Sequence, residues 1–339
     1  MKNRRIISIL FLLVCAAFFA YIGSAFSLPA LAAETAYLST GKEEAYTPQG
    51  GGYAASGQME GVGYTSELYD ATNSLPTSDA MFLMGADDGH MWIGGYSGVI
   101  RYDGSVFERL DTSNGLTSAR VFYEDSLGRI WVGTNDNGVV VLDGKERIHL
   151  TYKEGLPSSS IRAFAEDGKG NVFIGTTAGV CYADTQLNVG KVKGEEFPDD
   201  RILRLDADSS GRIYGHASSG IVFRIEDCRV KESFSGEELG LEMITTIMAD
   251  PKKPGSLYIG TEGNTLYHGR FGDPADDLEK TDLGSLQVVH WLNYDCGRVW
   301  VSSAQEAGYL DENSEFHLLR DIPIHSGIEM ITSDYQGNL

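Results

Sequence analysis

Two arginine side chains, Arg120 and Arg162, occupy equivalent places in two similar stretches of the sequence. Each lies five residues before an aspartate, Asp125 in the first stretch and Asp167 in the second. If the two stretches fold alike and lie side by side, the two guanidinium groups project in the same direction. Paired guanidinium groups can grip a carboxylate or a polar sugar through charge-assisted hydrogen bonds. The alternative is that each arginine pairs with a nearby acidic side chain, which a chain of net charge −21 supplies freely.

The sequence lacks the patterns that enzymes and metal sites require. Its 7 histidines are scattered, and neither a Ser/His/Asp order nor a His-x3-His spacing occurs. His216 stands apart from the others and is open to two interpretations, a structural histidine or a ligand-binding one. We therefore predict no catalytic residues, no bound metal and no cofactor.

The two arginines belong to a repeat that determines where their side chains point. Its core is a turn glycine, two further residues, an aromatic residue, then usually an apolar residue and a second glycine. The turn glycines lie 39, 42, 41, 44, 42 and 40 residues apart, a period typical of propeller blades or helical arrays. The copies read "GHMWIGG" from Gly89, "GRIWVGT" from Gly128, "GNVFIGT" from Gly170, "GRIYGHA" from Gly211, "GSLYIGT" from Gly255 and "GRVWVSS" from Gly297, and a seventh begins with "GNL" at Gly337.

Periodicity within each copy favours blades over helices. Short β-branched and aromatic runs such as "NVFIGT" alternate with turns such as "TAG", and no segment keeps the apolar spacing of a helix. Four short strands in roughly 40 residues are typical of a propeller blade. We therefore predict an all-β fold, a β-propeller of four-stranded antiparallel blades with six complete repeats and the start of a seventh.

The recurring residues have structural roles in this arrangement. The aspartate before the turn glycine can accept backbone hydrogen bonds, and the glycine can adopt a positive φ angle in the hairpin. One aromatic residue per repeat is predicted to wedge between neighbouring blades. These residues are Trp92, Trp131, Phe173, Tyr214, Tyr258 and Trp300.

Loops on one face of such a ring would surround the two arginines. Two sets of connections meet on that face, those that lead into each innermost strand and those that join the second strand to the third. We predict a ligand-binding site there. Its candidate residues are Tyr96, Arg120, Asn135, Asp136, Arg162, Thr177, His216, Glu262 and Gln305.

The N-terminal segment carries an export signal. Three basic residues precede an uncharged apolar run over residues 6–22, and a small-x-small cleavage site follows at residues 30–32. Residues 1–33 are therefore predicted to be a signal peptide or signal anchor. Residues 34–62 are predicted to be a flexible Gly/Ser-rich linker, and residues 63–339 the propeller sensor domain.

The charge and the cysteines exclude several classes of protein. The chain has 27 Lys and Arg against 48 Asp and Glu, and such an acidic surface repels nucleic acid. Three cysteines follow the signal segment, and their odd number and wide spacing argue against a disulfide framework or a zinc site. Cys181 aligns with the apolar Val140 of the preceding repeat, so we predict that it is a buried small hydrophobe.

The second and third copies follow the pattern GL(P/T)SS…EDxxGxxWVGTxxxGVxxxDG, which resembles the two-component regulator propeller repeat. The resemblance extends over about residues 70–339 and implies the sensor part of a bacterial membrane receptor. It also implies a cytoplasmic histidine kinase or diguanylate cyclase in the same full-length polypeptide. The residues present carry no kinase or cyclase motif, so we predict no enzyme activity for them.

The predicted function is ligand sensing outside the cytoplasm. The propeller would bind a small molecule or an oligosaccharide and relay the signal to the output domain, and homodimer formation stays open. The predicted location is the extracellular or periplasmic face of the cell membrane, with an anchor in the full-length form. The alternatives are an exported protein-interaction scaffold and a propeller lyase or hydrolase. The Asp-x-x-Gly-x-x-Trp turn is similar to the sialidase Asp-box, but its aspartate lies one position too early.

The seventh repeat predicts that the chain is truncated within a blade. "IEMITSDYQGNL" supplies an innermost strand and a turn, after which the repeat demands an aromatic residue and two more strands. Residues 63–76 are predicted to form an outermost strand that closes the ring, because an open sheet edge leaves backbone groups unpaired.

Overall fold

The computed structural model describes residues 68–71, 75–77, 79–110, 112–194, 200–320, 327–334 and 337–339. The predicted signal segment and linker, residues 1–33 and 34–62, lie outside the described residues. Within the described part of the chain, the single helical element is the short 3-10 helix η1 (Thr112–Asn114). None of the described helices has the length and apolar character needed to cross a membrane.

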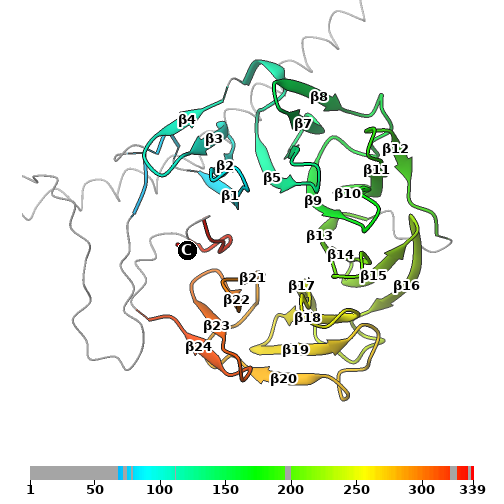
Figure 1. Ribbon diagram of the computed structural model, residues 1–339. Helices are drawn as coiled ribbons and strands as arrows, with labels where there is room; N and C mark the ends of the chain where they lie inside the picture. The colour runs from blue at the N-terminus through cyan, green and yellow to red at the C-terminus, as the bar shows by residue number, and fades with distance from the viewer. Residues whose placement is uncertain are drawn as a thin grey trace, which may run out of the picture. The chain divides into compact units, whose positions relative to one another are not determined.

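Each repeat folds into a four-stranded antiparallel sheet, and six such sheets surround one axis (Figure 1). The strands of each sheet pair in chain order, so every sheet is a simple meander. The first strand of each sheet lies nearest the axis and the fourth lies at the periphery (Figure 1). This arrangement confirms the predicted β-propeller.

The first three blades contain twelve strands. They are β1 (Ala80–Gly85), β2 (Met91–Gly95), β3 (Gly98–Tyr102) and β4 (Phe107–Arg109); β5 (Ala119–Glu124), β6 (Ile130–Thr134), β7 (Val139–Asp143) and β8 (Glu146–Leu150); and β9 (Ile161–Glu166), β10 (Val172–Thr176), β11 (Gly179–Ala183) and β12 (Val189–Lys191).

The remaining three blades have the same construction. They contain β13 (Ile202–Ala207), β14 (Ile213–Ala217), β15 (Ile221–Glu226) and β16 (Arg229–Ser235); β17 (Ile244–Ala249), β18 (Ser256–Thr261), β19 (Thr265–Arg270) and β20 (Glu279–Asp282); and β21 (Trp291–Asp295), β22 (Arg298–Ser302), β23 (Ala307–Leu310) and β24 (Phe316–Leu318).

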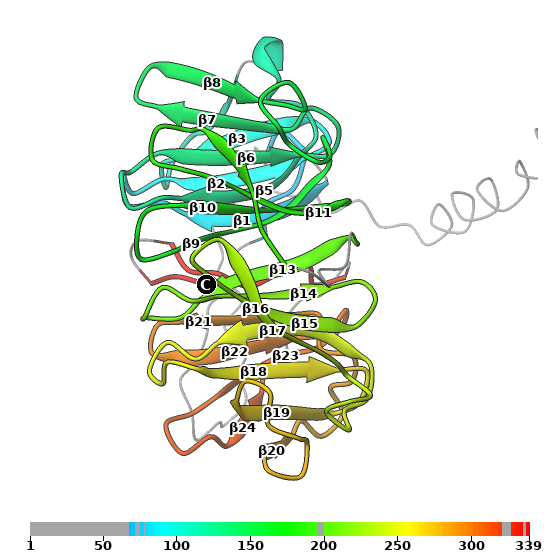
Figure 2. The same cartoon turned by 90° about the vertical axis from the view of Figure 1, so that its right-hand side faces the viewer.

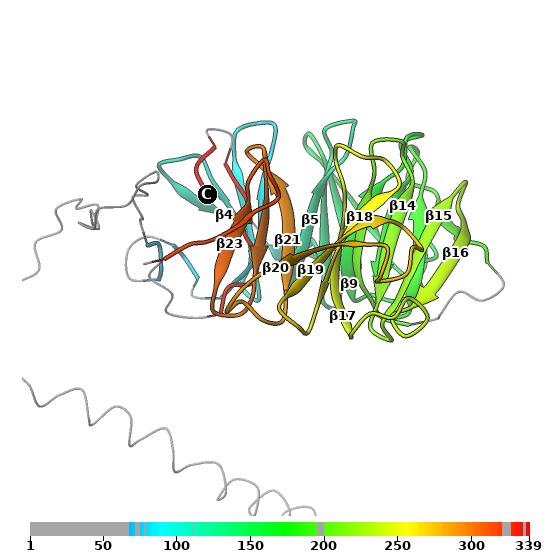
Figure 3. The ribbon, with the colours of Figure 1, turned by 90° about the horizontal axis from the view of Figure 1, so that it is seen from below.

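The strands run between two faces of the ring, which carry different loops (Figures 2 and 3). We call the face at which each innermost strand begins the arginine face, because Arg120 and Arg162 lie near it. We call the opposite face the turn face. It carries the Asp-x-x-Gly hairpins that join the first strand of each blade to the second.

A buried aspartate organises the hairpin of blade 2 on the turn face. Asp125 Oδ1 accepts hydrogen bonds from the backbone N–H groups of Leu127 (3.1 Å) and Arg129 (2.9 Å). Its Oδ2 accepts from Arg129 Nε (2.6 Å) and from the indole N–H of Trp131 (2.7 Å). One carboxylate thus fixes the turn, the side chain after the turn and the aromatic residue of the second strand.

Blade 4 repeats this arrangement with a tyrosine. Asp208 Oδ2 accepts hydrogen bonds from Arg212 Nε (2.9 Å) and from the hydroxyl of Tyr214 (3.1 Å). Burial alone would raise the pKa of Asp208, but hydrogen bonds from Ser210 and Arg212 outweigh burial and hold the pKa below its usual value. Blade 1 has Ala86 at this position, and its tryptophan N–H is buried without a partner among the described residues.

The aromatic residues wedge between blades as predicted. Trp131 is fully buried, and its ring meets Phe164 of blade 3 in a T-shaped contact at 6.0 Å. Tyr214 is also fully buried and meets Phe271 of blade 5 at 5.3 Å. Burial confirms the prediction for Trp92, Phe173 and Trp300 as well, whereas Tyr258 is half-buried.

The second glycine of the repeat lets neighbouring blades approach closely. A Cβ atom at Gly133 would lie 2.6 Å from Cγ2 of Ile161, the first residue of the next innermost strand. At Gly175 it would lie 2.7 Å from Cγ2 of Ile202. The side chain of the following blade therefore fills the space that a larger residue would need.

Cys181 is buried, and burial raises the pKa of its thiol to about 12, as expected for a small hydrophobe.

Residues 327–339 lie between the first and the last blade, beside β1 and β21 (Figure 1). The backbone N–H of Leu83 donates to Met330 Sδ (2.9 Å), and Ser333 donates through its backbone N–H to Asp295 Oδ2 (2.7 Å). The carboxylate of Asp334 accepts from the backbone and side-chain nitrogens of Asn338, as that of Asp125 accepts from those of Arg129. The turn of the predicted seventh repeat is therefore confirmed, whereas none of the described residues 327–334 belongs to its predicted innermost strand.

The predicted closing strand is not found. Among the described residues of this stretch, 68–71 and 75–77, none belongs to a strand. Tyr69 instead packs on blade 1, with its ring 5.7 Å from Tyr102 and 5.4 Å from Phe107. Aromatic contacts with β3 and β4 thus hold Tyr69 against blade 1.

Replacing the hairpin aspartate tests its structural role. Asp125→Ala leaves the side chain of Arg129, which is 6% exposed, as a buried charge without its partner. Removing one member of a buried ion pair destabilises a protein by about 3–5 kcal/mol, and we expect that loss in the urea unfolding free energy. Asp143→Ala, at an exposed hairpin of the same blade, is the control and should change stability by less than about 0.5 kcal/mol. Equal stability of the two variants would contradict the role assigned to Asp125.

Candidate functional site

A β-bulge places each arginine on the arginine face. The pairing register between β5 and β6 shifts between Ala119 and Val121, which leaves Arg120 as the extra residue. The register between β9 and β10 shifts in the same way around Arg162. A bulge re-aims the side chain of its extra residue, so both arginines leave their sheets at the same place. The expectation that neighbouring blades present them alike is met.

The two guanidinium groups lie close enough to affect each other. Burial lowers the pKa of the Arg162 guanidinium, and the positive charges of Arg120 and Arg201 lower it further. The phenol of Tyr96 acts in the opposite direction, which places this residue near the group as well. The arginine face therefore gathers three cations and one tyrosine from blades 1 to 4.

The contacts of Arg120 and Arg162 are with neutral groups. Arg120 Nη1 lies 3.5 Å from Met81 Sδ, and Arg162 Nη1 donates to Asn135 Oδ1 (3.0 Å) and to the carbonyl oxygen of Ile161 (2.8 Å). Within the described ranges, neither arginine forms an ion pair with a carboxylate. Pairing with nearby acids, the alternative for these residues, is therefore not seen there.

Arg201 is a functional candidate that the sequence did not reveal. It is exposed and immediately precedes β13, and its carbonyl accepts a hydrogen bond from Ser218 (2.8 Å). Ser118 and Ser160 hold the equivalent place in blades 2 and 3, because their carbonyls accept from Asn135 and Thr177 (both 3.1 Å). Alignment of these positions across the copies was the signal that could have found it.

The remaining candidates lie on the same face but outside the cation cluster. The hydroxyl of Thr177 bonds Ser158 of its own blade (2.8 Å), and Asp136 is exposed. Glu262 and Gln305 are exposed on blades 5 and 6. The structure thus brings together Tyr96, Arg120, Asn135 and Arg162. Among the described residues, no hydrogen bond or ion pair joins the side chains of these four to those of Asp136, Thr177, His216, Glu262 or Gln305.

His216 is a buried histidine rather than an exposed site residue. It is 1% exposed and occupies the place of the second repeat glycine in blade 4. Burial lowers the pKa of its ring to about 4. The backbone of Ile244 and the negative charge of Asp200 act to raise the pKa of the ring, but they do not offset the effect of burial. The Ile244 backbone lies outside hydrogen-bond geometry with the ring. The ring is therefore neutral at pH 7.

A second arginine of blade 4 reaches across the ring below the arginine face. Arg204 belongs to β13, and its guanidinium carbon lies 3.9 Å from the ring centre of Trp291 on β21. Its Nη2 also donates to the carbonyl oxygen of Leu292 (3.1 Å). Because blade 5 separates these two strands, the contact joins two blades that are not neighbours in the ring.

Comparison with known families confirms the predicted resemblance for two of the repeats. Residues 115–136 and 155–178 match the family described as two component regulator propeller. These are the two stretches that carry Arg120 and Arg162. No curated protein sequence matches the chain.

Solved structures share the fold at low sequence identity. A streptogramin B lyase superimposes with a TM-score of 0.63 at 14% identity, over 78% of this chain and 90% of that chain. Virginiamycin B lyase from Staphylococcus aureus gives 0.61 at 12% identity, over 75% and 89%. The extracellular domain of a putative hybrid two component system from B. thetaiotaomicron gives 0.62 at 19% identity, over 76% of this chain. This chain covers only 37% of that extracellular domain, and at these identities the likeness is one of fold.

Because His216 is buried and neutral, we expect the folded protein to lose stability in mild acid. Burial holds the pKa of His216 in the folded protein at about 4, below its ordinary value of 6.5, so the unfolded chain binds a proton first as the pH falls. The group's contribution is intact above about pH 6.5 and is lost on the way to pH 4, by about 3 kcal/mol in total. We expect His216→Gln to flatten the fall in urea unfolding free energy between these pH values. Parallel curves for the two proteins would show that His216 does not carry the effect.

Proposed function

We propose that the propeller is the ligand-sensing part of a bacterial signal-transduction receptor and that its arginine face binds a small anionic molecule. The matched two component regulator propeller repeats support the receptor assignment. The ligand includes a carboxylate or another oxyanion, and it can be a small acid or an acidic oligosaccharide.

The proposed class of ligand rests on one observation. Three cations lie together, and none of them has a carboxylate partner among the described residues. Burial lowers the pKa of the Arg162 guanidinium, and the positive charges of Arg120 and Arg201 lower it further. The chain has 48 acidic against 27 basic residues, so unpaired cations in one place are unexpected unless another anion binds there. An oxyanion would relieve this repulsion and accept charge-assisted hydrogen bonds.

The location and the partners follow from the receptor assignment. The ring would lie at the extracellular or periplasmic face of the cell membrane, anchored in the full-length polypeptide. A cytoplasmic output domain of that polypeptide would receive the signal, and two copies of the chain could form a homodimer. Extracellular domains of two component systems share the fold of this ring, which supports the proposed location.

A lyase is the alternative with a specific observation in its favour. The two lyase structures are matched over 90% and 89% of their own lengths, so they contain little beyond a ring of this kind. A protein-interaction scaffold is the other alternative. A lyase would consume its ligand, a scaffold would retain envelope proteins instead of small acids, and a sensor would bind its ligand and release it unchanged.

Removing the two arginines tests the proposed site. We expect calorimetric titration of the purified protein to detect binding of gluconate or succinate and none of neutral glucose. Because one charge-assisted hydrogen bond contributes about 1.5–3 kcal/mol, Arg120→Gln with Arg162→Gln should weaken binding at least about tenfold.

The matched control removes two positive charges elsewhere. Lys145 and Lys231 are exposed on outer parts of blades 2 and 4, and Lys145→Gln with Lys231→Gln should leave the affinity unchanged. Equal affinities of the arginine variant and the wild type would overturn the site. Retention of envelope proteins with no binding of either acid would favour the scaffold.

A further inference from the structure

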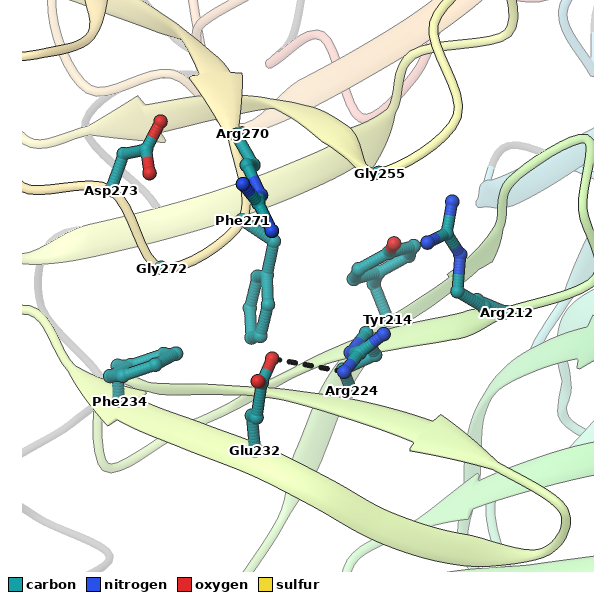
Figure 4. A pocket seen from close by; sticks show the side chains of 10 residues that line it. All are labelled: Arg212, Tyr214, Arg224, Glu232, Phe234, Gly255, Arg270, Phe271, Gly272 and Asp273. Atoms are coloured by element: carbon teal, nitrogen blue, oxygen red, sulfur yellow. Dashed lines mark ion pairs between the residues drawn. The ribbon is translucent and has the colours of Figure 1, made fainter.

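A cavity of about 290 Å³ lies between blades 4 and 5, away from the arginine face. Blade 4 contributes Tyr214 from β14, Arg224 from β15, and Glu232 with Phe234 from β16. Blade 5 contributes the hairpin glycine Gly255 and the turn of residues 270–273, which follows β19 (Figure 4). The volume is that of a small-molecule site at the lower end of the usual range.

The floor of this inter-blade cavity is rigid. The ring of Phe271 meets Tyr214 at 5.3 Å and Phe234 at 5.4 Å, both edge-on. The backbone N–H of Phe271 donates to the carbonyl oxygen of Gly255 (2.9 Å). Gly272 has a φ angle of +88°, and a Cβ atom there would lie 2.9 Å from the Phe234 ring. The turn that carries Arg270 is therefore fixed against blade 4 before any ligand arrives.

Three guanidinium groups line the cavity (Figure 4). Carboxylates hold two of them in place. Arg212 pairs with the buried Asp208 at 2.8 Å. Arg224 pairs with Glu226 at 3.0 Å and with Glu232 at 3.1 Å. These pairs fix the orientation of both guanidinium groups, and an arginine has five N–H donors, more than these contacts use.

Two donors of the cavity lack acceptors. Arg224 Nε is buried and has no hydrogen-bond partner among the described residues. Leaving a buried donor unsatisfied is unfavourable. The exposed side chain of Arg270 comes from the other blade, and within the described ranges it forms neither an ion pair nor a hydrogen bond. Arg224 Nε is shielded from the cavity by its burial, so of these two donors the N–H groups that an added acceptor can use are those of Arg270.

We propose that this inter-blade cavity binds the oxyanion group of a small molecule, a carboxylate or a phosphate. Arg270 supplies the unpaired charge, and the fixed guanidinium groups of Arg212 and Arg224 supply further donors. Planar guanidinium groups match the geometry of carboxylate and phosphate oxygens. The aromatic floor of Tyr214, Phe234 and Phe271 holds the two blades at the spacing that keeps the cavity open.

This site is separate from the one on the arginine face. Arg212 and Gly255 belong to the hairpins in which β13 and β17 end, whereas Arg120 and Arg162 lie where β5 and β9 begin. The two clusters therefore occupy opposite ends of the strands and different blades. Each can be removed without touching the other.

Calorimetric titration of the purified protein with inorganic phosphate and with succinate tests the cavity. The arginine face is also expected to bind succinate, and Arg120→Gln with Arg162→Gln removes that contribution. Binding of one probe or both that persists in this double variant is therefore the expected result for the cavity. Phosphate binding alone would identify a phosphate site, and succinate binding alone a carboxylate site. Arg270→Gln should weaken that binding at least about tenfold, because it removes a charge-assisted contact. Arg270→Lys, which keeps the charge, should restore part of the affinity.

Two results would overturn the proposal. One is the absence of binding by either probe to the wild-type protein at millimolar concentration. The other is an affinity in Arg270→Gln that stays within twofold of the wild type. Loss of binding only in the Arg120 and Arg162 variant would assign the probe to the arginine face and would also count against the cavity. Arg270 is exposed, so its variants should melt at the wild-type temperature and keep the comparison valid.

Discussion

The aspartate of the first hairpin is the interaction on which the ring depends. In blade 2 the Asp125 carboxylate holds the turn, Arg129 and the Trp131 indole together. Since the Trp131 ring is also the wedge against the next blade, the same carboxylate determines the geometry within one blade and the contact between two. Short repeats cannot bury their faces alone, and blade 4 repeats this link between turn and interface through Asp208 and Tyr214. Its partial loss at Ala86 leaves the Trp92 indole without a partner among the described residues.

The two faces of the ring treat charge differently. On the turn face, backbone N–H groups of neighbouring blades donate to carboxylates, as Asp87 does to Glu124 and Ser126 does to Glu166 (both 2.8 Å). Negative charge is thus used to join blades. On the arginine face, Arg120 and Arg162 contact neutral groups. Charge that is not needed for assembly is available for a ligand, and this division makes the arginine face the better candidate for sensing.

Much of the fold could be predicted from the sequence, because the same local pattern of turns and strands recurs in six copies. Turn glycines at an even period, one aromatic residue per copy and short β-branched runs left few alternatives to blades. The alignment of Arg120 with Arg162 followed for the same reason. Arg201 and the inter-blade cavity did not, since the fourth copy matches the repeat weakly and a cavity depends on how two blades pack. The segment before β1 was predicted as a strand, but none of its described residues belongs to one, and Tyr69 packs on aromatic side chains of blade 1.

Blade 4 is where departures from the repeat converge. It has Arg201 in the place of Ser160, Arg204 in the place of Ala163 and His216 in the place of Gly175. Scattered sequence drift would not direct these changes to connected positions. Arg201 joins the cations of the arginine face, Arg204 reaches β21 of blade 6, and the end of β13 leads to Arg212 in the inter-blade cavity. The six-residue strand β13 therefore connects the two proposed anion sites.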